Sequence, residues 1–234
     1  MGVLHIFGGP DIPEKGNKRR RTAMEPKFFP LLNIGGVPLL AAKGHFATRN
    51  SHINYFIDVT AQKYSLKGCR AVARELANRL QNRFQVDSIL CMDGTSAVGA
   101  CLARKLTQQG GRSLSEGDDM YIVKGELDSK GNLIFRDNAR FMLKDKKVLI
   151  LMCSLTTGTT ALQGKQSVEY YGGSVVGVAS IYAAVHELAG LPVVSVFDTN
   201  TIKDYASHSP SDCPMCKAGQ PIDAVVNTFG FSKI

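Results

Sequence analysis

A turn over residues 154–160 carries the side chains best suited to chemistry. Its polar members are Ser154, Thr156, Thr157, Gly158, Thr159 and Thr160. An apolar run comes before the turn, and a helical pattern follows it. Hydroxyls and backbone N–H groups therefore gather beside the positive end of a helix, which favours a phosphate or another anion. Gly158 lets the backbone approach that anion closely. The alternative is that these threonines only cap the helix.

A second polar turn follows another apolar strand pattern and also precedes a helix. It consists of Asp93, Gly94, Thr95 and Ser96. The backbone amides of this turn suit a diphosphate, and the Asp93 carboxylate suits a hydrated Mg²⁺. An ordinary turn with a helix cap is the competing interpretation.

Two cysteines near the end of the sequence have the spacing of a metal knuckle. Cys213 and Cys216 are separated by Pro-Met, and two thiolates at this spacing can hold one tetrahedral Zn²⁺. His208 is a candidate third ligand, and a symmetry-related chain could complete the set. A reduced surface pair or a redox-sensitive dithiol is the alternative. His45 and His52 are interpreted as structural residues, with no catalytic role.

Strand and helix patterns alternate along most of the chain. Apolar runs predict a strand pair over 45–48 and 52–59, and further strands over 86–92, 119–123, 147–152, 175–181 and 191–197. Helical spacing predicts helices over 66–84, capped by Ser65, and over 97–108, 160–171 and 183–189. This alternation predicts an α/β fold with a doubly wound parallel sheet, in which ligands bind beyond the carboxyl ends of the strands.

Composition favours one globular domain in a reducing compartment. The chain has 234 residues, of which 44% are hydrophobic and 21% charged, so neither general disorder nor a fibrous repeat fits. Its six cysteines are scattered, as in reduced proteins, and no apolar run is long enough to span a membrane, so we expect a cytoplasmic protein. The net charge of +8 owes much to a basic run over 15–21, which is typical of a solvated tail. Nucleic-acid binding through that tail is the weakest alternative.

The strand and turn over 147–160 resemble the fingerprint of the type I phosphoribosyltransferases. In that family, an apolar strand leads into a threonine- and glycine-rich loop that holds the 5-phosphate of phosphoribosyl pyrophosphate (PRPP). Residues 43–46, 50–58 and 89–99 look like segments of orotate phosphoribosyltransferase in particular. The resemblance implies that Asp93 to Ser96 and Lys124 hold the diphosphate with Mg²⁺. It also implies that residues 124–140 form a lid, although Ser129 to Asn132 equally suit the turn of a plain hairpin.

One departure from the family pattern bears directly on activity. The family has two carboxylates for the ribose hydroxyls where this chain has Met152 and Cys153. Losing two charge-assisted hydrogen bonds costs about 3–6 kcal/mol, or about two to four decades in binding or rate. Compensation by Ser154 or Asp93 is conceivable.

Two functions follow from the resemblance and from this departure. The first is transfer of phosphoribose between PRPP and a nitrogenous base in nucleotide synthesis or salvage, with no catalytic residue assigned. The alternative is a protein that binds PRPP or a nucleoside monophosphate without catalysis. We expect a flexible basic segment over 1–29, a phosphoribosyltransferase-like domain over 30–234 with a small N-terminal β hood, and a homodimer.

Overall fold

The core of the protein is a six-stranded sheet. The computed structural model describes residues 27–81, 83, 85–108, 119–129 and 132–234. The strand order is β10-β11-β9-β8-β4-β5, and neighbours are parallel except for the edge pair β10 and β11. The strands are β4 (Ser88–Cys91), β5 (Tyr121–Val123), β8 (Lys147–Leu155), β9 (Ser174–Ala183), β10 (Glu187–Leu188) and β11 (Leu191–Asp198).

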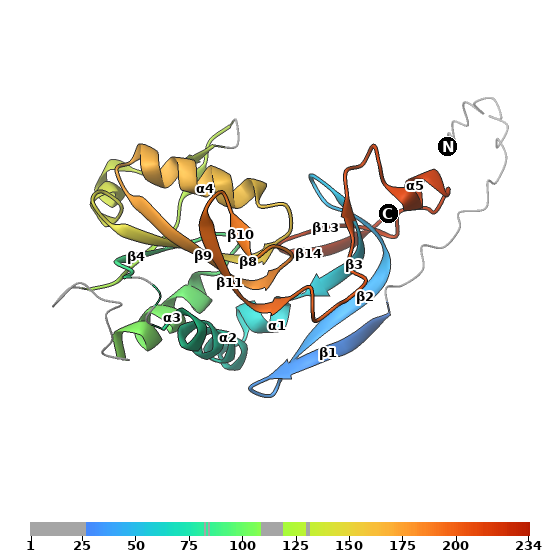
Figure 1. Cartoon of the computed structure of the whole chain (residues 1–234), viewed down its shortest axis with the longest axis horizontal. Coiled ribbons are helices and arrows are strands. Elements are labelled where there is room, and N and C mark those ends of the chain that lie inside the picture. Colours follow the sequence, from blue (N-terminus) through green and yellow to red (C-terminus); the bar gives the residue numbers. More distant parts are fainter. Residues whose placement is uncertain (1–26, 82, 84, 109–118, 130–131) are drawn as a thin grey trace, which may run out of the picture.

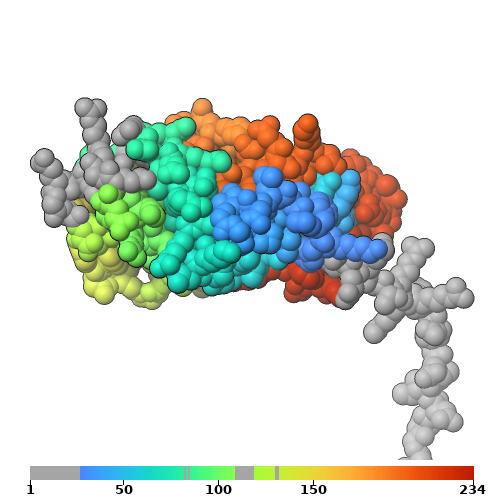
Figure 2. Space-filling model, turned by 90° about the horizontal axis from the view of Figure 1, so that it is seen from below, coloured from blue at the N-terminus to red at the C-terminus, as the bar shows by residue number. Residues whose placement is uncertain are grey.

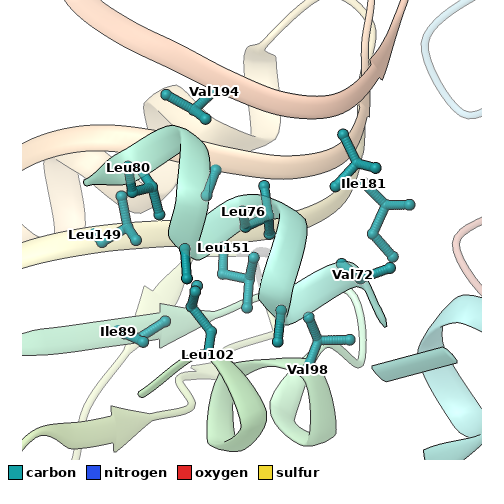
Figure 3. Packing of buried hydrophobic residues seen from close by; sticks show 14 of the residues in the cluster. Val72, Leu76, Leu80, Ile89, Val98, Leu102, Leu149, Leu151, Ile181 and Val194 are labelled. Carbon is teal, nitrogen blue, oxygen red and sulfur yellow. The ribbon is translucent and has the colours of Figure 1, made fainter. Parts of the chain in front are cut away.

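Helices cover both faces of this sheet, so the predicted doubly wound α/β architecture is confirmed. Helices α2 (Leu66–Leu80) and α3 (Ser96–Gln108) lie on one face and α4 (Thr159–Tyr170) on the other (Figure 1). Alternate side chains of β8 enter the two layers: Leu149, Leu151 and Cys153 pack with α2 and α3, and Val148, Ile150 and Met152 pack with α4. Figure 3 shows the first layer, where Leu149 and Leu151 lie against Leu76 and Leu80. This two-sided burial explains why the sequence of β8 is almost continuously apolar.

A second sheet forms the predicted hood, which lies beyond the carboxyl ends of the core strands. Its order is β12-β3-β2-β13-β14, and β1 also pairs with β2. The strands are β1 (Phe28–Ile34), β2 (Val37–Ala47), β3 (His52–Asp58), β12 (Ser207–His208), β13 (Ala224–Asn227) and β14 (Gly230–Lys233). The parallel pair of β2 and β13 joins segments far apart in the sequence, and Figure 2 shows the first strands beside the last residues.

Short elements complete the described part of the chain. Helix α1 (Thr60–Tyr64) connects the hood to α2, and Ser65 caps α2 by accepting a hydrogen bond from the Gly68 amide, as expected. The remaining elements are the β6 (Glu126–Leu127) and β7 (Leu133–Ile134) hairpin, the 3₁₀ helix η1 (Asp137–Met142) and α5 (Pro214–Lys217). None of the helices in the described residues is both long and apolar enough to cross a membrane.

Two sequence predictions need correction. The helix expected over 183–189 does not form: this stretch returns in extended conformation and supplies β10, which pairs with the start of β11. A seven-residue helix rises only about 10 Å, whereas an extended strand of that length spans about 23 Å and can return to the start of a parallel neighbour. The segment expected to be flexible over 1–29 lies outside the described residues up to residue 26, but β1 already begins at Phe28.

Candidate functional site

A cavity of about 340 Å³ lies between the carboxyl edge of the core sheet and the hood. The core contributes Asp93, the stretch from Met152 to Thr160, and Tyr182. The hood and the segments attached to it contribute residues 48–51, 55–60, 226–228 and Tyr205. This is the edge at which ligands of doubly wound sheets bind, so the cavity lies where the sequence places the site.

The hydroxyl-rich turn forms the floor of this cavity. All six predicted phosphate-binding residues line it: Ser154, Thr156, Thr157, Gly158, Thr159 and Thr160. Strand β8 continues to Leu155, three residues beyond the expected strand end, and α4 begins at Thr159. Thr157 and Thr159 are exposed, and their hydroxyl oxygens lie 3.2 Å apart. The turn is therefore open to solvent and lies directly before a twelve-residue helix, which is the geometry of an anion site.

Gly158 is required by the backbone and by its neighbours. Its φ of 81° lies in the left-handed region, which strains any residue with a Cβ. A Cβ at this position would also lie 2.3 Å from Cδ1 of Leu188, in the edge strand β10. The segment between β9 and β11, which contains β10, thus packs against the hydroxyl-rich turn at Gly158.

Met152 and Cys153 are buried within β8, just before its last two residues, and carry no charge into the cavity. Both line it, but Met152 packs on the α4 side of the sheet and Cys153 on the side of α2 and α3. Burial, together with the nearby Asp93 carboxylate, raises the pKa of the Cys153 thiol to about 12. The thiol is therefore neutral at physiological pH and cannot replace a carboxylate as a charged acceptor.

Asp93 is the buried carboxylate of the site. It adopts a φ of 56° and is followed by Gly94 at 75°, a sharp turn that directs the chain from β4 toward α3. Its Oδ2 atom is buried without a hydrogen-bond partner among the described residues. Burial raises the pKa of the Asp93 carboxyl above its ordinary value, and the Lys63 ammonium opposes this rise. Lys63 is itself only 1% exposed, and its Nζ donates to the backbone carbonyls of Asp93, at 3.2 Å, and Thr228.

The other residues expected to bind a diphosphate lie outside the cavity lining. Both polar groups of Thr95 are engaged by the fold: its hydroxyl lies 2.7 Å from the Met92 carbonyl and 3.0 Å from that of Leu151, and its amide donates to Met92 as well. Thr95 is also fully buried, so both groups stabilise the turn in this structure, and its contact with a diphosphate stays a prediction. Gly94 and Ser96 are exposed beside Asp93, and exposed Lys124 follows the end of β5 at the same edge of the sheet.

The predicted lid contains a hairpin that reaches the site. Strands β6 and β7 pair antiparallel, which confirms the hairpin prediction; Lys130 and Gly131 of its expected turn lie outside the described residues. Leu127 in β6 is 67% exposed and lines the cavity. The hairpin therefore presents an apolar side chain at the cavity.

Sequence reasoning missed several residues of the site. Arg49 lines the cavity from the loop between β2 and β3, and Asn227 lines it from the end of β13. Lys63 was also missed, because α1 is too short to show a helical pattern. The cavity-lining residues of β13 could not be assigned from the sequence, since their pairing with β2 leaves no local signal.

The two predicted zinc ligands lie against two histidines of the hood. The Sγ atoms of Cys213 and Cys216 and one ring nitrogen each of His45 and His52 all lie within 4.8 Å of one another. His208, the ligand considered from the sequence, is absent from this group among the described residues, although it pairs with His52 through the backbone of β12.

Comparison with known proteins agrees with this fold. No family model matches the chain. A stretch of 79 residues is 30% identical to orotate phosphoribosyltransferase of Chlorobaculum parvum and covers 34% of this chain but only 40% of that enzyme. The UMP synthase of Leishmania donovani superposes with a TM-score of 0.51 at 14% identity, over 68% of this chain and 34% of that one. A phosphoribosyltransferase from Corynebacterium diphtheriae gives 0.49 at 16% identity, over 68% and 89%.

The sequence match and the shared architecture agree with the resemblance seen in the hydroxyl-rich turn. This chain combines three features: a core sheet with helices on both faces, a hood, and an open turn before α4. The chain therefore has the fold of the type I phosphoribosyltransferases, and part of its sequence is similar to an orotate phosphoribosyltransferase.

Proposed function

We propose that this protein binds a 5-phosphorylated ribose in its cavity and transfers phosphoribose between diphosphate and a nitrogenous base. The observation that carries the proposal is the open turn over 154–160, with Gly158 in the left-handed region at the start of α4. Free amides at the start of this helix and the Thr157 and Thr159 hydroxyls would hold the 5-phosphate. PRPP and nucleoside monophosphates both carry this group.

Asp93 fits the role expected for it beside the diphosphate. The residue lines a cavity whose floor would already hold a phosphorylated sugar, and its buried Oδ2 has no hydrogen-bond partner among the described residues. A carboxylate oxygen is the type of ligand that Mg²⁺ takes together with phosphate oxygens. Mg²⁺ would neutralise charge on the diphosphate when bound, while Asp93 would orient it or accept a bond from a ribose hydroxyl. The guanidinium of Arg49 would add positive charge from the hood side.

The hood and the β6–β7 hairpin would enclose the nitrogenous base. Tyr182 lines the cavity with a buried hydroxyl that has no partner in the described residues, so it is free to recognise a polar ligand atom. Leu127 would limit the entry of water once a ligand is present. Orotate is the base named for the enzyme that matches in sequence, so it is the first base to test.

Binding without transfer is the second candidate, and Met152 and Cys153 favour it. Two neutral sulfur side chains stand where the family has two carboxylates, so charge on an oxocarbenium-like ribose would find less stabilisation. The phosphate turn does not depend on these residues, and binding would survive their replacement.

Calorimetric titration with PRPP and with nucleoside monophosphates, each with and without Mg²⁺, tests both candidates. Pyrophosphate release is measured in parallel over a panel of bases that includes orotate and adenine. Binding with release supports the transferase, and binding without release supports the second candidate. No binding of PRPP, nucleoside monophosphates or ribose 5-phosphate at millimolar concentration refutes both.

A pair of variants at one position separates the two candidates further. Cys153→Asp returns one carboxylate beside the cavity, and Cys153→Ser is the matched control because it adds a polar group without charge. One charge-assisted hydrogen bond contributes about 1.5–3 kcal/mol, so Cys153→Asp should raise release about 10- to 100-fold if the transfer machinery is otherwise intact. Equal rates for both variants would contradict a transferase limited by its missing acids.

The proposal includes a homodimer, as expected from the family resemblance. Light scattering of the purified full chain at several concentrations measures the assembly state. A monomer that still releases pyrophosphate would remove the dimer from the proposal and leave the reaction in place.

A further inference from the structure

Four metal-binding side chains from three parts of the chain meet at the end of the hood remote from the core. His45 lies in β2 and His52 in β3, while Cys213 is the N-cap of α5 and Cys216 lies within that helix. Figure 1 shows α5 beside β2 and β3. His45 and Cys213 are fully buried and His52 nearly so, whereas Cys216 is exposed. The cluster belongs to neither the cavity floor nor the diphosphate turn.

The distances within the cluster are those of a tetrahedral site. Bonds of about 2.0–2.1 Å from zinc to nitrogen and 2.3 Å from zinc to sulfur place two nitrogens about 3.3 Å apart and a nitrogen and a sulfur about 3.6 Å apart. The ring nitrogens of His45 and His52 lie 3.1 Å apart. The Cys213 and Cys216 sulfurs lie 3.5 and 3.6 Å from His45 Nε2, and Cys216 lies 3.2 Å from His52 Nδ1. One ion fits between these four atoms with little movement.

The neighbours of His45 orient it as a ligand. Its Nδ1 lies 3.0 Å from the carbonyl oxygen of Gln220, which can only accept, so Nδ1 carries the proton. Nε2 then keeps its lone pair and faces the other three side chains. A carbonyl oxygen that accepts from the other ring nitrogen commonly fixes a metal-binding histidine in this way. The single lone pair cannot accept from His52, Cys213 and Cys216 at once, whereas a central cation would satisfy all four.

Backbone hydrogen bonds within residues 213–220 hold the segment around α5, which carries both cysteines, in its conformation. The Lys217 amide donates to the Cys213 carbonyl, and the Gln220 amide donates to that of Met215. Gly219 adopts a φ of 70°, which allows the chain to turn back toward the hood. The same short segment therefore supplies both sulfur ligands and the carbonyl that orients His45.

We infer that His45, His52, Cys213 and Cys216 bind one structural Zn²⁺. Two thiolates and two imidazoles are a ligand set that zinc takes in structural sites, and hard cations such as Mg²⁺ prefer oxygen. Because the protein supplies all four ligands, no position is left for water, so the ion acts on stability and does no chemistry.

The position of this site connects zinc to the cavity. Residues 48–51, which line the cavity, lie between His45 and His52. Strand β13, which carries Asn227 into the cavity, follows the knuckle and pairs with β2 from Phe46. The ion would thus fasten both cavity-lining segments of the hood to α5, and its loss would loosen the hood while leaving the core sheet intact.

Metal analysis of the purified full chain tests the inference directly. We expect about one equivalent of zinc by mass spectrometry, from the one-ion ligand set. After replacement of zinc by Co²⁺, we expect the visible bands of tetrahedral cobalt and a sulfur-to-cobalt charge-transfer band. A folded wild-type chain that contains no zinc, and that gives no thiolate–cobalt spectrum on titration with Co²⁺, overturns the inference. Recovery of Cys213 and Cys216 as a disulfide would do so as well and would identify a redox pair.

Variants locate the ion. Cys216→Ser alters the exposed ligand, so the chain should still fold while bound zinc is lost. His208→Ala and Cys101→Ser are matched controls, since neither residue belongs to the four-atom group, and both should keep zinc. Zinc retained by Cys216→Ser and lost from His208→Ala would assign the site elsewhere. Because zinc is measured without substrate, these results are independent of phosphoribose binding.

Discussion

Lys63 offers a sharp test of how the core and the hood are joined. Its buried ammonium donates to the carbonyls of Asp93, at the end of β4, and Thr228, between β13 and β14. It also lies 4.8 Å from the ring centre of Tyr64 and 5.5 Å from that of Phe229. The substitution Lys63→Met keeps the length of the side chain and removes its charge and its donors.

We expect Lys63→Met to lower the free energy of unfolding by about 2–6 kcal/mol at neutral pH, because the carbonyls of Asp93 and Thr228 each lose their donor at about 1–3 kcal/mol. The variant also removes the positive charge that opposes the rise in the pKa of the Asp93 carboxyl. In the variant this pKa rises further. When the pKa of a carboxyl is higher in the folded state than in the unfolded state, protonation favours the folded state. This stabilisation is fully present below the pKa of the unfolded state and is lost as the pH rises through the pKa of the folded state. The deficit of the variant should therefore shrink on acidification.

Urea denaturation at several pH values measures this effect. Lys67→Met is the matched control, because Lys67 is exposed in the next helix and its replacement should cost little. In the double variant Lys63→Met/Asp93→Asn, we expect recovery of part of the loss, because the buried carboxylate is gone. A deficit as small as that of Lys67→Met, or one that does not change with pH, would refute the coupling of Lys63 to Asp93.

Three further predictions concern the turn, a helix cap and a thiol. Gly158→Ala should destabilise the protein by about 1–3 kcal/mol more than Gly172→Ala. Both variants place a Cβ on a residue with a left-handed φ, but only the Cβ at position 158 would clash with a neighbouring side chain. Equal free energies of unfolding for the two variants would contradict this. Ser65→Ala should cost about 1 kcal/mol in urea denaturation through loss of the α2 cap, and an unchanged midpoint would show that the cap is dispensable. Cys153, with its pKa near 12, should resist iodoacetamide at pH 8 while partly exposed Cys101 reacts; mass spectrometry that finds Cys153 alkylated first would disprove its burial.

The sequence predicted those parts of the fold that depend on local patterns. The apolar run of β8, the α2 pattern behind Ser65 and the hydroxyl-rich turn are each contained in a few consecutive residues, and each appears as expected. The helix expected over 183–189 failed although its residues favour helices, because the strand pairing of β11 with β9 requires an extended return. Tertiary geometry overrode local propensity at that point.

The missing parts of the candidate site depend on contacts across most of the chain. The sulfur of Cys213 lies beside His45, from which it is separated by 168 positions in the sequence. A prediction from neighbouring residues therefore selected His208 instead. Lys63 meets the Thr228 carbonyl across 165 residues, and nothing near Lys63 in the sequence indicates that its ammonium is buried. The strand order of the hood brings these distant residues into contact. The spacing of residues along the sequence does not indicate that strand order.

The pairing of β13 with β2 bears on how this protein matures on the ribosome. The His45 amide in β2 donates a hydrogen bond to the carboxylate of Asp223, which lies 178 residues later in the chain, just before β13. The core strands and α2 to α4 are all synthesised before residue 224 and can pack early, whereas β2 must wait for its parallel neighbour. Closing so long a loop is slow, because its entropy must be lost before the contacts form. A nascent chain would therefore hold an ordered phosphate turn beneath an unfinished hood, and ligand affinity would appear only once β13 had emerged and docked.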